Sequence, residues 1–72
     1  MMAGDWTQLK LNGVQYSVNA VRTHVTIYSI KEKCSQTLSV QELRDKLDDQ
    51  FLHPVLCKMY RAMLDVYESE NT

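Results

Sequence analysis

The stretch that decides the fold is Leu9-Lys10-Leu11-Asn12-Gly13-Val14-Gln15-Tyr16-Ser17-Val18. Asn-Gly is the preferred pair for a two-residue type I′ turn, because both central residues need a positive φ. Pairing the chain outward from this turn places Leu11 opposite Val14, and Leu9 then faces Tyr16. These apolar side chains share one face, and the polar side chains between them share the other. The pattern predicts an antiparallel hairpin with one buried face and one solvated face.

Strands are predicted near 6–11 and 14–19, and a third over 21–30, which is rich in Val, Thr, Ile and Tyr. This third segment alternates imperfectly. Val25 and Ile27 share one side, whereas Tyr28 and Ile30 share the other. We therefore expect either a bulge near Ile27 and Tyr28 or an end that a second chain covers. The polar segment 31–36 indicates a turn or loop, followed by a short extended piece at 37–38.

Two helices are expected after this loop. Ser39 and Glu42 have the spacing of a capping box, in which each side chain bonds to the other residue's backbone N–H. Leucines at helical spacing follow and predict a first helix over about 40–50. Pro54 suits the first position of a second helix, because the N–H it lacks would be unpaired there. An apolar stripe extends this helix to about 68, and the polar residues after Tyr67 are expected to fray.

Together these elements predict an α+β fold, a three-stranded antiparallel β-meander followed by two α-helices packed on one face (βββαα). We expect a single small domain over 1–72 with an ordered core of about 6–68. The predicted core consists of Leu9, Leu11, Val14, Tyr16, Val18, Val25, Ile27, Val40, Leu43, Leu47, Leu56, Met59, Tyr60 and Met63.

Size and composition restrict what the chain can be. A chain of 72 residues buries only about 60% of its unfolded surface, and small chains commonly gain stability from a partner subunit. We therefore expect a homodimer, which would also cover Tyr28 and Ile30 on an edge strand. The net charge of −1 provides no positive field for nucleic acid or anionic lipid. No apolar run is long enough for a membrane span and residues 1–6 lack a signal-peptide pattern, so we expect a cytoplasmic protein.

The histidines and cysteines are the candidates for a metal site. His24, Cys34, His53 and Cys57 form a His₂Cys₂ set, which suits zinc in principle. Their spacing does not match the common zinc sites, because the chain has no Cys-x-x-Cys and His53 is expected to cap the second helix. We therefore expect no metal and no other cofactor. The cysteines are expected to be free thiols in or near the core, with Cys57 beside the apolar stripe.

Catalysis and nucleic-acid binding have little support in the sequence. The cysteines and histidines lack an orienting motif, the paired carboxylates lie in surface-like stretches, and the two glycines form no phosphate-binding loop. We therefore expect no catalytic residues and no enzyme activity. Nucleic acid is not an expected partner, because the second helix sets only Lys58 and Arg61 against Asp65 and Glu68.

The end of the second helix runs against helix electrostatics. Acidic residues oppose the dipole at a helix C-terminus, yet Asp65, Glu68 and Glu70 lie there beside Tyr67. An acidic and aromatic surface suits a basic protein partner. The leading interpretation is a small non-catalytic protein-binding module, an inhibitor or adaptor of the kind that phages and plasmids make. The alternatives are a dimeric DNA-binding transcriptional regulator that uses the second helix, and a small zinc-binding module.

Overall fold

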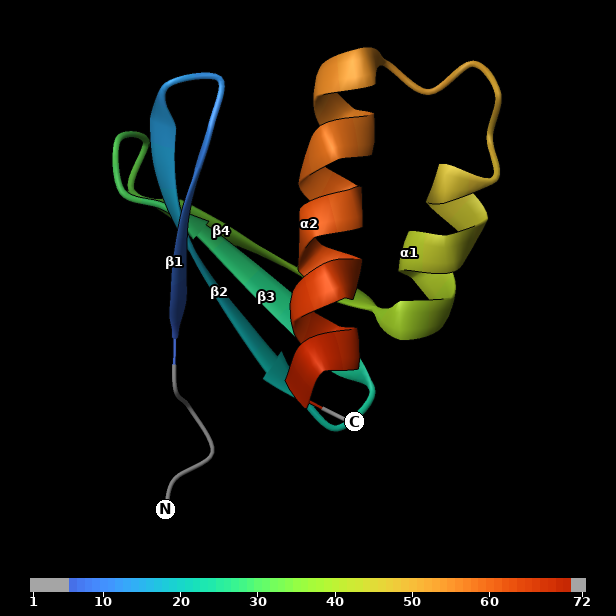
Figure 1. The fold of residues 1–72 in the computed structure, drawn as a ribbon, viewed down its shortest axis with the longest axis horizontal. Coiled ribbons are helices and arrows are strands. Elements are labelled where there is room, and N and C mark those ends of the chain that lie inside the picture. The colour runs from blue at the N-terminus through green and yellow to red at the C-terminus, as the bar shows by residue number, and fades with distance from the viewer. Residues whose placement is uncertain (1–5, 71–72) are drawn as a thin grey trace.

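The computed structural model describes residues 6–70, which adopt an α+β fold (Figure 1). Four strands form one antiparallel sheet in the order β1-β2-β3-β4, so each strand pairs with its neighbour in sequence. Two helices follow the sheet and lie on one of its faces. The elements are β1 (Thr7–Leu11), β2 (Val14–Val21), β3 (His24–Ser29), β4 (Cys34–Ser39), α1 (Val40–Leu47) and α2 (Pro54–Glu70).

The hairpin at Asn12-Gly13 has the predicted turn and register. Asn12 has φ 52° and Gly13 has φ 79°, so both central residues adopt the left-handed conformation that a type I′ turn requires. Leu9 pairs with Tyr16 across the two strands, as expected. Nothing lies within 4 Å of a Cβ built at Gly13. The backbone conformation, and not a lack of space, therefore makes glycine suitable at this position.

The three predicted strands correspond to β1, β2 and β3, but the turn between the second and the third lies two residues later than predicted, and a fourth strand follows them. β2 continues to Val21, the chain reverses at Arg22 and Thr23, and β3 begins at His24. Arg22 has φ 57°, a conformation that glycine and asparagine adopt more readily than arginine. The pairing of β3 with β2 and with β4 is unbroken. β3 is therefore an interior strand without the expected bulge, and Tyr28 does not lie on an edge.

The fourth strand begins in the polar segment 31–36, which was expected to be a turn or loop. The loop before it ends at Lys33, which has φ 55° and donates its N–H to the Ser29 carbonyl at 2.8 Å. β4 then pairs with β3 along its whole length. Leu38 is buried, whereas Cys34 and the three residues after it are exposed. The strand is polar because most of its side chains face solvent, so it lacks the alternation expected of a half-buried strand.

The first helix starts as predicted and ends earlier than predicted. Ser39 Oγ accepts a hydrogen bond from the Glu42 N–H at 3.1 Å, and Glu42 Oε1 accepts one from the Ser39 N–H at 3.0 Å. This pair is the expected capping box. α1 ends at Leu47 rather than near residue 50. The Asp49 N–H donates to the Lys46 carbonyl at 3.2 Å, a short-range bond of the kind that closes a helix.

The second helix also has its expected start. Pro54 is its first residue, and His53 Nδ1 accepts a hydrogen bond from the Val55 N–H at 3.1 Å, so His53 caps the helix. α2 continues to Glu70, and the expected fraying directly after Tyr67 is therefore wrong. A helix of this length reaches from one end of the sheet to the other (Figure 1).

The core lies between the sheet and the two helices. α2 packs mainly on β2 and β3, and α1 packs beside it and against β4 (Figure 1). Several predicted core residues are less buried than expected, since Leu11 and Val14 are half-buried outside the core cluster and Leu56 is 36% exposed. Leu38 belongs to the core although it was not predicted there. The buried core consists of Val18, Val25, Ile27, Leu38, Val40, Leu43, Tyr60 and Met63.

The opposite face of the sheet carries no helix among residues 6–70. Its polar side chains pair with one another across the strands. Ser17 Oγ donates to Gln8 Oε1 at 2.9 Å, and the Thr26 and Thr37 hydroxyl oxygens lie 2.8 Å apart.

Neither helix in the described part of the chain has the length and apolar character that crossing a membrane requires.

Candidate functional site

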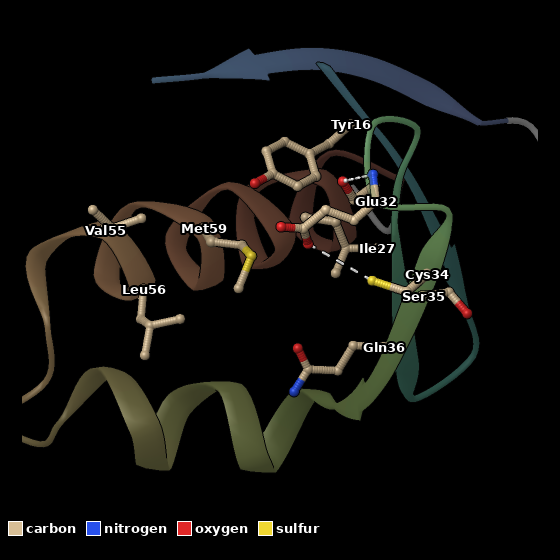
Figure 2. A pocket seen from close by; sticks show the side chains of 10 residues that line it. Tyr16, Ile27, Glu32, Cys34, Ser35, Gln36, Val55, Leu56 and Met59 are labelled. Atoms are coloured by element: carbon tan, nitrogen blue, oxygen red, sulfur yellow. Dashed lines mark hydrogen bonds between the residues drawn. The ribbon is translucent and has the colours of Figure 1, made fainter. Parts of the chain in front are cut away.

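A groove lies between β4 and the N-terminal half of α2 (Figure 2), and we call it the β4–α2 groove. Residues of β3 and β4 form its floor, Leu56 and Met59 of α2 form a wall, and Glu32 lies at one end. Its volume is about 420 Å³. Its lining residues are Tyr16, Ile27, Ser29, Glu32, Cys34, Ser35, Gln36, Val55, Leu56 and Met59.

The β4–α2 groove is open because α1 covers only one half of β4. Along the side of β4 that faces the helices, Leu38 is buried in the core, whereas Gln36 and Cys34 are exposed. Residues 48–53 then carry the chain from α1 to the start of α2. No described helix covers the first half of β4, and Val55 and Leu56 keep 47% and 36% of their surface exposed. The groove therefore has an apolar wall that the chain itself leaves unfilled.

Glu32 provides the charge of the groove. Among the described lining residues it alone is acidic or basic. Its N–H donates to Ser29 Oγ at 3.2 Å, and its Oε1 accepts from the Cys34 thiol at 3.8 Å. Figure 2 shows the carboxylate directed over the groove toward Met59. The site thus combines an apolar wall with one negative charge at its end.

The backbone of β4 forms the remaining side of the site. β4 pairs with β3 on one side and with no described strand on the other. The Val40 N–H donates to the Thr23 carbonyl at 2.8 Å, so these residues form a hydrogen-bonded pair at the end of this ladder. Such pairs alternate along antiparallel strands. The N–H and C=O groups of Ser35 and Thr37 therefore point away from β3, toward the open edge.

The acidic end of α2, predicted to bind a partner, forms a separate and smaller hollow. Asp65 and Glu70 line a hollow of about 180 Å³ with neighbouring residues of α2 and the start of β1. Glu68 is exposed outside this hollow, while Tyr67 is half-buried and packs against the core. The structure brings two of the four residues together at one hollow, and the binding role of all four stays a prediction.

The four candidate zinc ligands do not converge. His24 pairs with Ser39 at one end of the β3–β4 ladder, and Cys34 lies at the other end. At about 3.4 Å per residue, this separates the two by roughly 17 Å along the sheet. No group of three or more His, Cys, Asp or Glu side chains within residues 6–70 is placed to hold a metal ion. Both cysteines are exposed, so the expectation that they lie in or near the core is wrong.

The surface of α2 is mixed in charge. Lys58 and Arg61 are exposed, and so are Asp65 and Glu68 further along the helix. Alternating signs give phosphate groups a weak target, because each cation that could neutralise a phosphate has an anion close by. The DNA-binding interpretation stays a prediction that nothing in the structure favours.

Comparison of the chain with protein-family models, with curated proteins and with solved structures gives no match. The functional argument therefore depends on the site itself.

The sequence analysis did not predict the β4–α2 groove, although one signal was available. Val55 and Leu56 lie side by side at the start of α2, and Val55 falls outside the apolar stripe of Leu56, Met59, Tyr60 and Met63 that the helical spacing places on the core.

Proposed function

We propose that this chain is a non-catalytic protein-binding module that holds a segment of a partner protein in the β4–α2 groove. One observation carries the proposal. An apolar groove of about 420 Å³ lies directly beside a strand whose outer backbone groups have no described strand to pair with. Protein segments bind in such places because main-chain hydrogen bonds supply affinity while side-chain pockets supply specificity.

The exposed apolar side chains support a macromolecular partner. Val55 and Leu56 stay about half and one third exposed at the mouth of the groove. Exposed apolar surface that is contiguous and rimmed by polar groups is typical of interaction sites. The polar rim consists of β4 residues such as Ser35 and Gln36. A bound segment would remove this apolar surface from water, which is the main favourable contribution to protein association.

The groove has little of what catalysis requires. Cys34 is its one strong nucleophile by residue type, and the described lining residues include no histidine, lysine or arginine to activate it. Glu32, the nearest charged group, accepts a hydrogen bond from this thiol. Binding without chemistry therefore accounts for the lining residues better than a reaction does.

A photo-crosslinking experiment tests the proposal. p-Benzoylphenylalanine is placed at Leu56, on the groove wall, and in a control at Lys10, on the opposite edge strand. Both variants are expressed in the source organism and irradiated. We expect a discrete protein adduct from the Leu56 position that the Lys10 position does not give. An equal pattern at both positions, or none at either in folded variants, would contradict the proposal.

The expected homodimer stays a prediction, but the structure does not place Tyr28 and Ile30 on an edge strand. Tyr28 lies on an interior strand, and Ile30 lies in the β3–β4 loop with 46% of its surface exposed. The free edge of β4 is now the place where a second copy could pair. Sedimentation equilibrium over a concentration series measures this directly, and a single species of 8.4 kDa throughout would show that the chain is a monomer.

A further inference from the structure

We propose that the partner binds as an extended segment that adds a fifth strand to β4, with apolar side chains in the β4–α2 groove and a lysine or arginine beside Glu32. This inference rests on the proposed function and gives the chemistry of its partner. Three independent features support it: the unpaired backbone of β4, the direction in which a new strand would place its side chains, and the position of the Glu32 carboxylate.

The backbone supports an extended ligand rather than a helical one. Ser35 and Thr37 direct their N–H and C=O groups toward the open edge, as the alternation of the β3–β4 ladder requires. An added strand satisfies these groups, and a helix cannot, because its own backbone groups are already bonded to one another. β4 also has no charged residue, no proline and no break in its register. Charged residues, prolines and bulges are the features with which proteins protect a free edge. Because β4 lacks them, its edge is open to pairing.

The groove accepts side chains from such a strand. An added strand would lie about 4.8 Å from β4, and alternate side chains would point to the face that carries the helices. On that face they meet Leu56 and Met59 of α2, beyond Gln36 of β4. Apolar side chains at every second position of the partner would therefore enter the groove, while the side chains between them point to the open face.

The charge of Glu32 favours a partner segment that contains a basic residue. Glu32 is the single acidic or basic group among the described groove residues, and its carboxylate lies over one end of the groove. Glu32 is exposed, so a lysine or arginine in the bound strand could reach it from solvent, and the pair would add specificity more than affinity. A second copy of this chain suits the site less well, because its β4, Cys34–Ser39, has no basic residue, and its nearest lysines, Lys31 and Lys33, lie in the loop before the strand.

A selection followed by binding measurements tests the inference. Random linear peptides displayed on their mRNA are selected on the full chain, and the tightest binder is synthesised and measured by fluorescence anisotropy. We expect enriched sequences with apolar residues at alternate positions and one lysine or arginine near an end of that pattern. Amide exchange of the complex, followed by NMR, should slow at Ser35 and Thr37. Enriched peptides that bind as helices, or without these two amides, would overturn the inference.

A matched pair of proline variants isolates the edge of β4. Ser35→Pro removes an N–H that points to the open edge and should leave pairing with β3 intact. Lys10→Pro makes the equivalent change on β1, because Lys10 lies next to the hydrogen-bonded Leu11 pair of the hairpin. We expect Ser35→Pro to weaken peptide binding about tenfold or more and Lys10→Pro to leave it unchanged. Equal binding by both folded variants would overturn strand addition.

Glu32→Gln tests the charge separately. It should weaken binding of the basic peptide by about twofold to fivefold and abolish the preference for lysine or arginine in a repeated selection. An unchanged preference would overturn the role of Glu32.

The outcomes of these experiments also separate the two proposals. If peptides bind at Leu56 but ignore Ser35 and Glu32, the protein-binding function stands and the strand model fails. If neither peptides nor crosslinked proteins are found, the proposed function itself fails, and concentration-dependent dimerisation through β4 would assign the edge to a second copy.

Discussion

The two edge strands of the sheet, β1 and β4, differ in charge and in what lies beside them. β1 contains Lys10 and starts next to the last turns of α2, whereas β4 is uncharged and its first half lies beside the open groove. Charged side chains on an edge, lysine above all, discourage pairing with other chains. The comparison indicates that one edge of this sheet is protected and the other is available for a partner.

The largest effect is expected from the residue that attaches β4 to the core. Leu38 is 6% exposed, and it is the buried side chain of its strand. Leu38→Ala should lower the free energy of unfolding by about 2–4 kcal/mol, because it removes apolar contacts and leaves a cavity. Leu9→Ala on β1 should cost about 1–2 kcal/mol, since Leu9 is only half-buried. Urea denaturation measures both, and equal losses would show that the two edges are attached equally well.

The turn that holds β1 comes next. Gly13 has φ 79°, a conformation that a β-branched residue adopts only with strain. Gly13→Val should therefore destabilise the protein by about 1–3 kcal/mol through strain of the local backbone, since nothing beyond the chain neighbours lies within 4 Å of a Cβ built there. Gly13→Asn is the matched control and should cost less, since asparagine tolerates the left-handed region. A denaturation midpoint that Gly13→Val leaves unchanged would mean that this turn does not set the register.

The junction of β4 and α1 should give a dependence on pH. The Ser39 backbone N–H, which donates to Glu42, lowers the pKa of this carboxyl below its ordinary value of 4.5, and the Ser39 hydroxyl and Lys46 act in the same direction. A lowered pKa in the folded state contributes stability that is fully present above 4.5 and is lost as the pH falls through the lower value. Unfolding measured between neutral pH and strong acid should show this loss, and Glu42→Gln should reduce it. An identical pH profile in the variant would exclude Glu42 as its source.

The smallest effect on stability is expected at the acidic end of α2. Asp65→Lys with Glu68→Lys should leave the fold intact and stabilise it by a few tenths of a kcal/mol, because cations suit a helix C-terminus. If a basic partner also contacts this end, the double variant should slow its association and reverse the salt dependence of the association rate. Binding kinetics that do not change in the folded variant would show that these carboxylates only keep the surface soluble.

The sequence predicted the fold where a local signal and a burial pattern agree. Asn12-Gly13 identified the first turn and its register, and Ser39 with Glu42 identified the start of α1. The second turn was placed about two residues too early because Arg22 adopts a positive φ without belonging to the residue types that usually do so. An arginine there looks like an ordinary strand residue, so residues 21–23 were assigned to the third strand.

The β4–α2 groove could not be predicted from local sequence patterns, for a different reason. A strand with one buried side chain, Leu38, has almost no alternation to detect. The groove also depends on where α1 ends, at Leu47, and on how far residues 48–53 carry the chain before α2 begins. These are distances between elements, which side-chain periodicity does not encode. The apolar side chain of Val55, outside the stripe of the second helix, was a local trace of the groove in the sequence.

The order of the strands has a consequence for folding kinetics. Each strand pairs with the next one along the chain, and the connecting turns are short, at residues 12–13, 22–23 and 30–33. Every hairpin can therefore close by a short loop, at a small entropic cost, before the helices dock. Sheets with local pairing of this kind have a low contact order and refold faster than sheets of similar size with distant partners. β4 is the last strand along the chain. Until it pairs, the exposed edge of the sheet is β3, with its Val, Ile and Tyr side chains. Rapid closure of the final hairpin therefore limits the time in which that edge can aggregate.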